Sequence, residues 1–181
     1  MVKIYQTLDE ALQEIDFAGM SLGFGHGKFK DKKHEEYTFI RWLSMSAELL
    51  GISMEKSPEQ NEKECPFYKH KTEACYVFLE LVRNAYRLGV DGQEGRRFHA
   101  GVYSGSRGIV VGTEQEANFL TREHIELLKQ GRPVPSTNTE NPGGLGTQII
   151  TNVADGLFIS EEKRAIYVLR LFSSPARESI L

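Results

Sequence analysis

One stretch of the sequence places a carboxylate and an amide four residues apart within a helical pattern. The segment ELVRNAYRLG carries Glu80 and Asn84, and residues at this spacing lie one turn apart on the same helix face. An amide oxygen can complete the shell of a magnesium ion held mainly by phosphates and water, and a nearby carboxylate can orient or deprotonate a nucleophile. The pair also fits a surface glutamate and a capping-type asparagine, so the spacing alone leaves both interpretations open.

A second stretch combines glycines with the expected start of a helix. In NPGGLGTQII, Gly143, Gly144 and Gly146 precede or enter a helix that we expect from about Thr147 to Ala154. Bare backbone N–H groups and the positive end of a helix dipole can receive phosphate oxygens. The same glycine pattern is common in ordinary loops.

The elements that must position these residues follow from periodicity. An apolar stripe predicts a helix over residues 73–88, closed by Gly89. The next segments are FHAGVYSG and RGIVVG, which predict two antiparallel strands, and a helix is expected over residues 121–130. A loop rich in Pro, Gly, Ser, Thr and Asn then leads to the glycine stretch, and GLFISEEKRAIYVLRLF predicts a closing hairpin.

The N-terminal part is expected to be mainly helical. We expect a short strand over residues 2–5, a helix over residues 9–15 capped by Thr7, and a helix over residues 34–50. The glycine-rich AGMSLGFGHGKFKDKK is interpreted as a loop, or a strand leading into one, and SPEQNEKECPFYKHK as a connection. His26 and His34 are interpreted as surface histidines, and Tyr37, Phe39 and Trp42 as packing residues.

The order of these motifs resembles the GHKL superfamily of ATPases and kinases (histidine kinase-like ATPase domains), over residues 74–173. The match lies in E-x-x-x-N-A followed by Gly89, two strands, a loop with a helix, a glycine turn into a helix, and a hairpin. The short anti-sigma serine kinases are the most similar type. The resemblance implies an α+β, two-layer sandwich of the Bergerat type, whose mixed sheet is covered on one face by helices. Residues 1–70 would be a mainly helical extension, and the whole chain, 1–181, a single domain.

By resemblance, Glu80 would be the general base and Asn84 the magnesium ligand. Gly143, Gly144, Gly146 and Thr147 would contact the triphosphate of ATP, and the segment between Thr113 and Pro142 would form a lid over it. The family reads adenine with an Asp followed two residues later by Gly, just after a strand. Here Gly112 and Glu114 stand at those positions, so Glu114 is the acidic group left to reach the base.

Composition fits an ordinary globular protein. Hydrophobic residues make up 40% and charged residues 26%, with a formal net charge of −3, which argues against a nucleic-acid-binding surface. No apolar run is long enough to span a bilayer, and the N-terminal MVKIYQTLDEALQEI has acids where a signal peptide needs apolar residues. We therefore expect a cytoplasmic protein, which by the resemblance would bind ATP and Mg²⁺.

Two other functions remain open at this level. The missing Asp favours a degenerate module without nucleotide turnover, which would act by binding a protein partner or as a homodimer. Cys65, His70 and Cys75 offer a third interpretation as metal ligands, but they lack the close pairs typical of structural zinc sites.

Overall fold

The structure, a computed structural model, describes residues 2–26, 29–89, 96–116, 120–132, 134 and 145–175. Within these ranges one sheet of six strands runs through the molecule in the order β1-β5-β6-β4-β3-β2. The strands are β1 (Lys3–Tyr5), β2 (Phe17–His26), β3 (Arg97–Gly105), β4 (Gly108–Gln115), β5 (Gly156–Ser160) and β6 (Ala165–Leu171). β1 pairs with β5 in parallel and all other neighbours are antiparallel, so the sheet is mixed as predicted.

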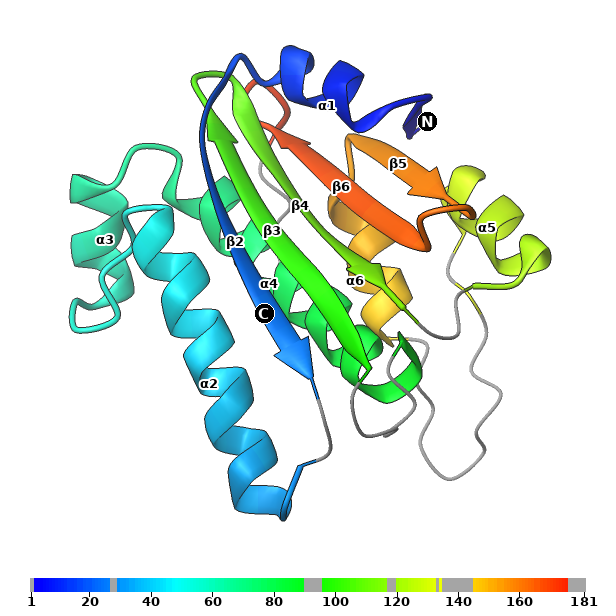
Figure 1. Cartoon of the computed structure of the whole chain (residues 1–181). Coiled ribbons are helices and arrows are strands. Elements are labelled where there is room, and N and C mark those ends of the chain that lie inside the picture. Colours follow the sequence, from blue (N-terminus) through cyan, green and yellow to red (C-terminus); the bar gives the residue numbers. More distant parts are fainter. Residues whose placement is uncertain are drawn as a thin grey trace.

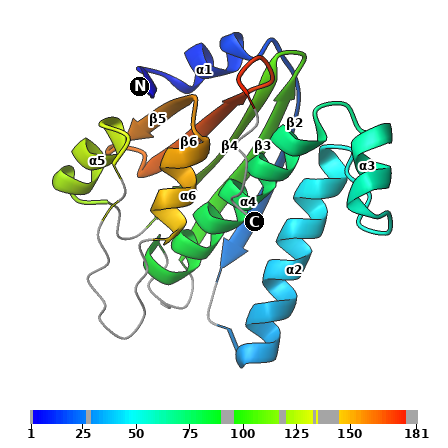
Figure 2. The same ribbon diagram turned by 180° about the vertical axis from the view of Figure 1, so that it is seen from behind.

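Helices cover one face of this sheet (Figures 1 and 2). They are α2 (Lys32–Leu49), α4 (Tyr68–Asn84) and α6 (Leu145–Val153), with a π-helical turn, η1 (Ala85–Gly89), directly after α4. Their buried side chains share one core with the sheet, and α4 contributes the most deeply buried of them, including Val77, Phe78 and Val82. The two-layer α+β sandwich is confirmed.

The opposite face is covered only in part. The short helix α1 (Leu8–Glu14) packs there over a smaller core that includes Ile15, Tyr103, Val110 and Tyr167. α5 (Arg122–Lys129) lies beside the β5 end of the sheet, and Thr121 caps it by accepting a hydrogen bond from the His124 N–H. The stretch of this face over β2 carries no helix among the described residues (Figure 1).

The N-terminal segment is mainly helical, as expected, but it also supplies both edge strands of the sheet. β1 lies at one edge and β2 at the other. The glycine-rich segment is interpreted from the sequence as a loop, or a strand leading into one, and the strand interpretation is confirmed over Phe17–His26, where the glycines allow close packing. A Cβ on Gly23 would lie 2.6 Å from Cη2 of Trp42, and one on Gly25 would lie 2.2 Å from the Phe98 ring.

The connection expected over SPEQNEKECPFYKHK is wrong in its first half, which forms α3 (Pro58–Glu64), and at its end, where α4 begins at Tyr68. Ser57 accepts from the Gln60 N–H, and the Gln60 side chain accepts from the Ser57 N–H, which is a complete capping box. Pro58 at the first turn is compatible with a helix start because that position needs no N–H donor. The residue pattern S-P-E-Q is therefore a helix start and not a break.

Candidate functional site

The end of α4 presents the two polar residues that the sequence singled out. Glu80 and Asn84 lie on a helix whose other faces are packed against its neighbours, so the partly exposed side of α4 is narrow. Glu80 forms an ion pair with Arg83, with 2.6 Å between its Oε1 and the arginine Nη1. Arg83 in turn lies over the Phe39 ring of α2 at 5.3 Å, which directs this pair toward α2. The Glu80 carboxylate is thus held by a neighbour in its own helix.

Asn84 closes α4 and has a different environment. Its side chain is partly buried and forms no hydrogen bond within the described part of the chain. The π-turn that follows is fixed by Tyr86, whose hydroxyl accepts a hydrogen bond from Trp42 Nε1 at 3.4 Å and whose ring packs on Phe98 at 4.7 Å. This anchoring sets the position of the helix end, and it leaves the Asn84 amide available to a ligand.

The first turn of α6 lies at the same end of the sheet as the last turn of α4 (Figures 1 and 2). Ile150 and Val153 of α6 share a core with Val77 of α4, which holds the two helices side by side. Gly146 lies in this first turn, while the predicted ligands Gly143 and Gly144 lie outside the described residues. Glu80 and Asn84, in the last turns of α4, therefore lie at the same end of the helix-covered face as the first turn of α6, with the Glu80–Arg83 pair turned toward α2.

Thr147 has a structural role in this arrangement. Its Oγ1 accepts a hydrogen bond from the Val134 N–H at 3.1 Å and lies 3.2 Å from the Val134 carbonyl oxygen, to which it can donate. Val134 belongs to the segment expected to form the lid. The hydroxyl of Thr147 therefore fastens that segment to α6, a contact that the sequence did not predict.

Gly112 and Glu114 lie on the other face of the sheet. A Cβ on Gly112 would come within 2.1 Å of the Tyr167 ring, and the Tyr167 hydroxyl donates to Glu114 Oε1 at 3.1 Å. Burial raises the pKa of Tyr167 well above its ordinary value, so it stays a hydrogen-bond donor. The structure does not bring Glu114 to Glu80 and Asn84.

Thr113 is the polar residue of β4 that does face the helices. Ile109 and Val111 belong to the core beneath α4, and the alternation of strand side chains puts Thr113 on that same side, where it is buried. The sequence prediction missed it because it matched positions to an Asp-x-Gly motif. The period-two pattern from Ile109 and Val111 was the signal that could have identified it.

The proposed metal ligands Cys65, His70 and Cys75 do not form a site. His70 Nε2 lies 2.7 Å from the Ser174 carbonyl oxygen, Cys65 contacts the Lys71 ammonium, and burial raises the pKa of the Cys75 thiol to about 11. Across the described ranges no three His, Cys, Asp or Glu side chains are grouped to hold a metal ion. Of the N-terminal histidines, His34 accepts a hydrogen bond at Nδ1 from the Lys30 N–H, and His26 is the last residue of β2.

One end of the helix-covered face therefore combines a carboxylate, the start of a glycine-containing helix and an amide that has no partner among the described residues. The donor set suits a magnesium ion held mainly by phosphate oxygens, with one amide oxygen from the protein. Within the described ranges, no helix has both the length and the apolar character needed to cross a membrane. No family model matches the chain, and no curated protein is significantly similar to it.

Proposed function

We propose that this chain is an ATP-binding domain of the GHKL type, which binds Mg²⁺-ATP between the end of α4 and the start of α6. The observation that carries the proposal is that the last turns of α4, which hold Glu80 and Asn84, lie at the same end of the helix-covered face as the first turn of α6. These two stretches are more than 60 residues apart along the chain. We also propose the cytoplasm as its location.

In this proposal each residue has a defined task. Asn84 supplies an oxygen ligand to Mg²⁺ because its amide has no hydrogen-bond partner in the described structure. Backbone N–H groups at the start of α6, with Gly146 among them, face the phosphates. Thr113, on the helix side of β4, is placed to bond the base through its hydroxyl.

Glu80 is the proposed base, and its ion pair predicts slow turnover. A carboxylate that holds Arg83 at 2.6 Å must leave that partner before it can accept a proton from a nucleophile. The reaction would be hydrolysis of ATP, or transfer of its terminal phosphoryl group to a hydroxyl of a protein partner. In both cases the nucleophile oxygen forms a bond to the γ-phosphorus while the bond from that phosphorus to the bridging oxygen of ADP breaks. ADP leaves, and the proton of the nucleophile passes to Glu80.

Two variants at the site and one matched control test the proposal. Glu80→Gln keeps the shape of the side chain, so we expect nucleotide binding to persist while release of phosphate is lost. Asn84→Ala removes the amide, and we expect it to weaken binding about tenfold in the presence of Mg²⁺ and little in its absence. Glu161→Gln, in the exposed turn between β5 and β6, is the control and should change neither property. Unchanged turnover in Glu80→Gln would refute its role as the base.

A second function is favoured by the orientation of β4. No carboxylate of this strand, which is described over its full length, faces α4, because Glu114 bonds Tyr167 on the other side of the sheet. A pocket without a carboxylate to accept a hydrogen bond from the adenine amino group distinguishes ATP poorly from other nucleotides. The alternative is therefore a module that has this fold, binds no nucleotide and acts through protein contacts, and calorimetry with ATP, GTP and ADP separates the two.

A further inference from the structure

The outer edge of the sheet at β2 has no neighbouring strand among the described residues. β2 spans ten residues and pairs only with β3, so every second residue directs its N–H and C=O groups away from the sheet. None of these groups is bonded to another backbone group in the described structure. The strand FAGMSLGFGH also contains no proline, lysine or acidic residue, which are the usual devices that protect an edge from pairing.

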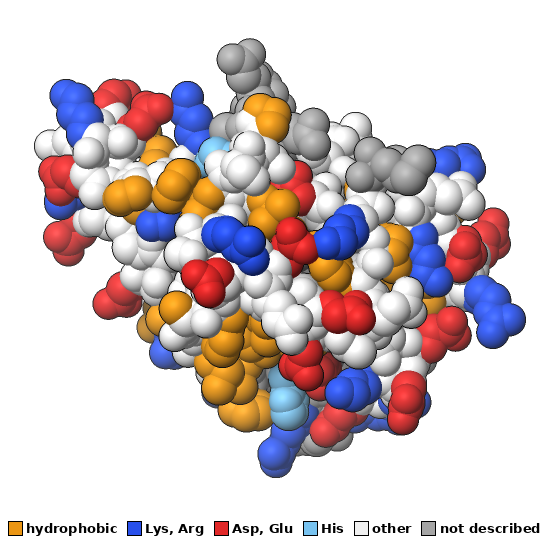
Figure 3. All heavy atoms as spheres, turned by 90° about the horizontal axis from the view of Figure 1, so that it is seen from above, with side chains coloured by type: hydrophobic (Ala, Val, Ile, Leu, Met, Phe, Trp, Pro, Cys, Tyr) orange, Lys and Arg blue, Asp and Glu red, His pale blue; other side chains and the backbone are white. Residues whose placement is uncertain are grey.

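Apolar side chains project from this same strand on the face that no described helix covers. Met20 and Phe24 are each 62% exposed and Leu22 is 50% exposed. Phe24 also packs against His99 of β3, with ring centroids 4.7 Å apart. Figure 3 shows the resulting group of hydrophobic side chains beside a histidine on this side of the molecule. An added strand that places its own apolar side chains here would extend the patch and bury it.

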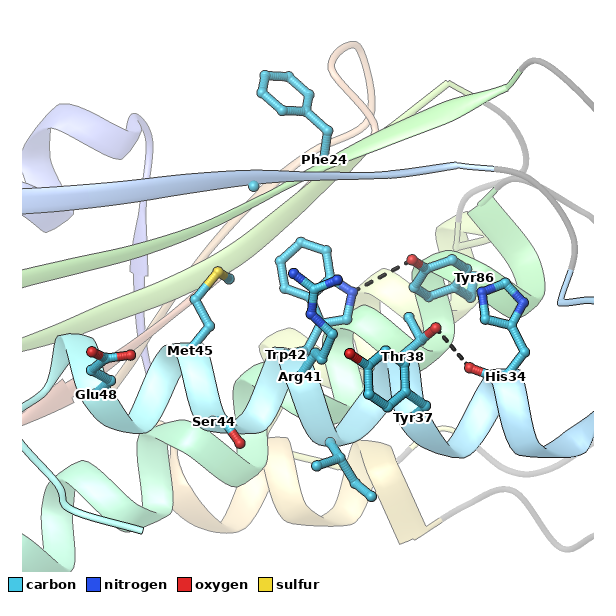
Figure 4. Close-up of a pocket in the computed structure, with 12 residues that line it drawn as sticks. Phe24, His34, Tyr37, Thr38, Arg41, Trp42, Ser44, Met45, Glu48 and Tyr86 are labelled. Carbon is cyan, nitrogen blue, oxygen red and sulfur yellow. Dashed lines mark hydrogen bonds between the residues drawn. The ribbon is translucent and has the colours of Figure 1, made fainter. Parts of the chain in front are cut away.

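A groove of about 570 Å³ runs between β2 and α2 on the other side of the edge. Its floor is formed by Trp42 and Met45, which rise from α2 toward β2, whereas Phe24 points away from α2 (Figure 4). Gly23 makes this approach possible, because a Cβ there would collide with the Trp42 ring. The groove therefore has a backbone edge as one wall and a helix as the other.

The helix wall carries two charges without an ionic partner. Arg41 and Glu48 line the groove, are exposed, and form no ion pair with any described residue. They are seven residues apart, which corresponds to about 10 Å along the helix. Arg41 is steadied by the Tyr37 ring, 5.9 Å away. An occupant of the groove would meet a positive group near Phe24 and a negative group farther along α2.

We propose that this groove binds an extended segment of a partner protein, which adds to β2 as a further strand of the sheet. The segment would alternate apolar residues, which meet Met20, Leu22 and Phe24, with polar residues that face α2. Among the latter we expect an acidic residue opposite Arg41 and a basic residue opposite Glu48. Strand addition of this kind takes its affinity from backbone hydrogen bonds and its specificity from alternate side chains.

The position of α2 selects a single segment over a second copy of this chain. α2 lies lateral to β2 in Figures 1 and 2, beyond the edge of the sheet. Antiparallel pairing of two β2 strands would place both helix layers on the same face, because one sheet would continue into the other. The two α2 helices would then meet at the junction, whereas an isolated strand avoids this contact.

The test is selection of random ten-residue peptides displayed on phage against the immobilised full chain, followed by binding measurements with the selected peptides. We expect peptides that alternate apolar and polar residues, and that lose at least about tenfold in affinity when Leu22→Lys is introduced into the strand. The outward-facing amides of β2 should become protected from hydrogen exchange when a peptide is bound. Selected peptides that leave β2 unprotected, or a selection that yields none, would overturn the proposal.

Charge reversal gives a second readout that a purely structural role would not change. Selection against Arg41→Glu should replace the acidic residue of the peptides by a basic one at the same position. Arg122→Glu, an exposed reversal on α5, is the matched control and should leave the selected sequences unchanged. An unaltered consensus with Arg41→Glu would contradict the assigned contact. A wild-type dimer in light scattering that Leu22→Lys dissociates would show that a second copy occupies the edge, and would refute the single-segment occupant.

Discussion

Replacement of Arg170 by methionine should destabilise the protein strongly without preventing it from folding. The Arg170 side chain is 1% exposed and lies in the centre of a polar cluster under α4. Its Nε donates to Glu73 Oε2 at 2.7 Å, its Nη1 to Asp155 Oδ2 at 2.9 Å, and its Nη2 to the Pro175 carbonyl oxygen at 2.8 Å. One guanidinium thus joins β6 to α4, to the turn before β5 and to the C-terminal segment.

The magnitude follows from what the substitution leaves behind. Methionine fills much of the arginine volume, but the carboxylates of Glu73 and Asp155 then lose the guanidinium to which both are bonded. Removal of one partner from a buried ion pair costs about 3–5 kcal/mol, and a domain is commonly stable by about 5–15 kcal/mol. With a urea dependence of about 2 kcal/mol per molar, the unfolding midpoint should fall by about 2 M.

Urea denaturation followed by circular dichroism measures this shift. A chain that combines Arg170→Met with Glu73→Gln and Asp155→Asn should recover part of the loss, because the two amides carry no charge. The side-chain oxygen of the asparagine introduced by Asp155→Asn can also still accept from the Leu171 N–H, as the carboxylate of Asp155 does. A loss below about 1 kcal/mol for Arg170→Met alone would refute the reasoning, as would a triple variant no more stable than the single one.

Four further predictions concern buried residues. Both cysteines are buried, so neither should react rapidly with a thiol reagent in the native state. Burial raises the pKa of Cys75 from 9.0 to about 11. The stability that the neutral thiol contributes is therefore complete below pH 9 and is lost as the pH rises toward 11. Denaturation of the wild type and of Cys75→Ala at alkaline pH will measure this loss, which the variant should lack. Asn61→Ala should cost about 1–3 kcal/mol in thermal or urea unfolding, since the buried Asn61 amide bonds the N–H and the carbonyl of Ser53; a change near zero would show that water replaces these bonds. Gly112→Ala should cost about 1–3 kcal/mol, because its Cβ would lie 2.1 Å from the Tyr167 ring, whereas Gly19→Ala, with its nearest contact at 3.8 Å, is the matched control and should be nearly neutral.

Periodicity predicted most of the elements around the candidate site. The stripe from Val77 to Ala85 identified α4, alternation identified β3 and β4, and the charged turn before Ala165 identified the last hairpin. These patterns were informative because each element buries one face against a shared core, and burial imposes the period.

The sequence did not predict the role of the β2 glycines, the face of the sheet on which Glu114 lies, or the groove beside α2. Closely spaced glycines such as Gly23 and Gly25 are typical of loops. In the structure they allow Trp42 and Phe98 to pack closely against β2, and these contacts are formed by residues far away in the sequence. Matching by motif placed Glu114 at the base-binding position, although strand alternation turns it to Tyr167. The groove joins Gly23 to Arg41 through tertiary contact, so no local pattern indicated it.

Calorimetric titration of the full chain with ATP, with and without Mg²⁺, tests the central proposal most directly. We predict saturable binding of ATP that Mg²⁺ strengthens. Asn84→Ala should weaken this binding about tenfold, and only when Mg²⁺ is present. Absence of any heat of binding, or binding that Asn84→Ala leaves unchanged in the presence of Mg²⁺, would contradict a nucleotide site between α4 and α6.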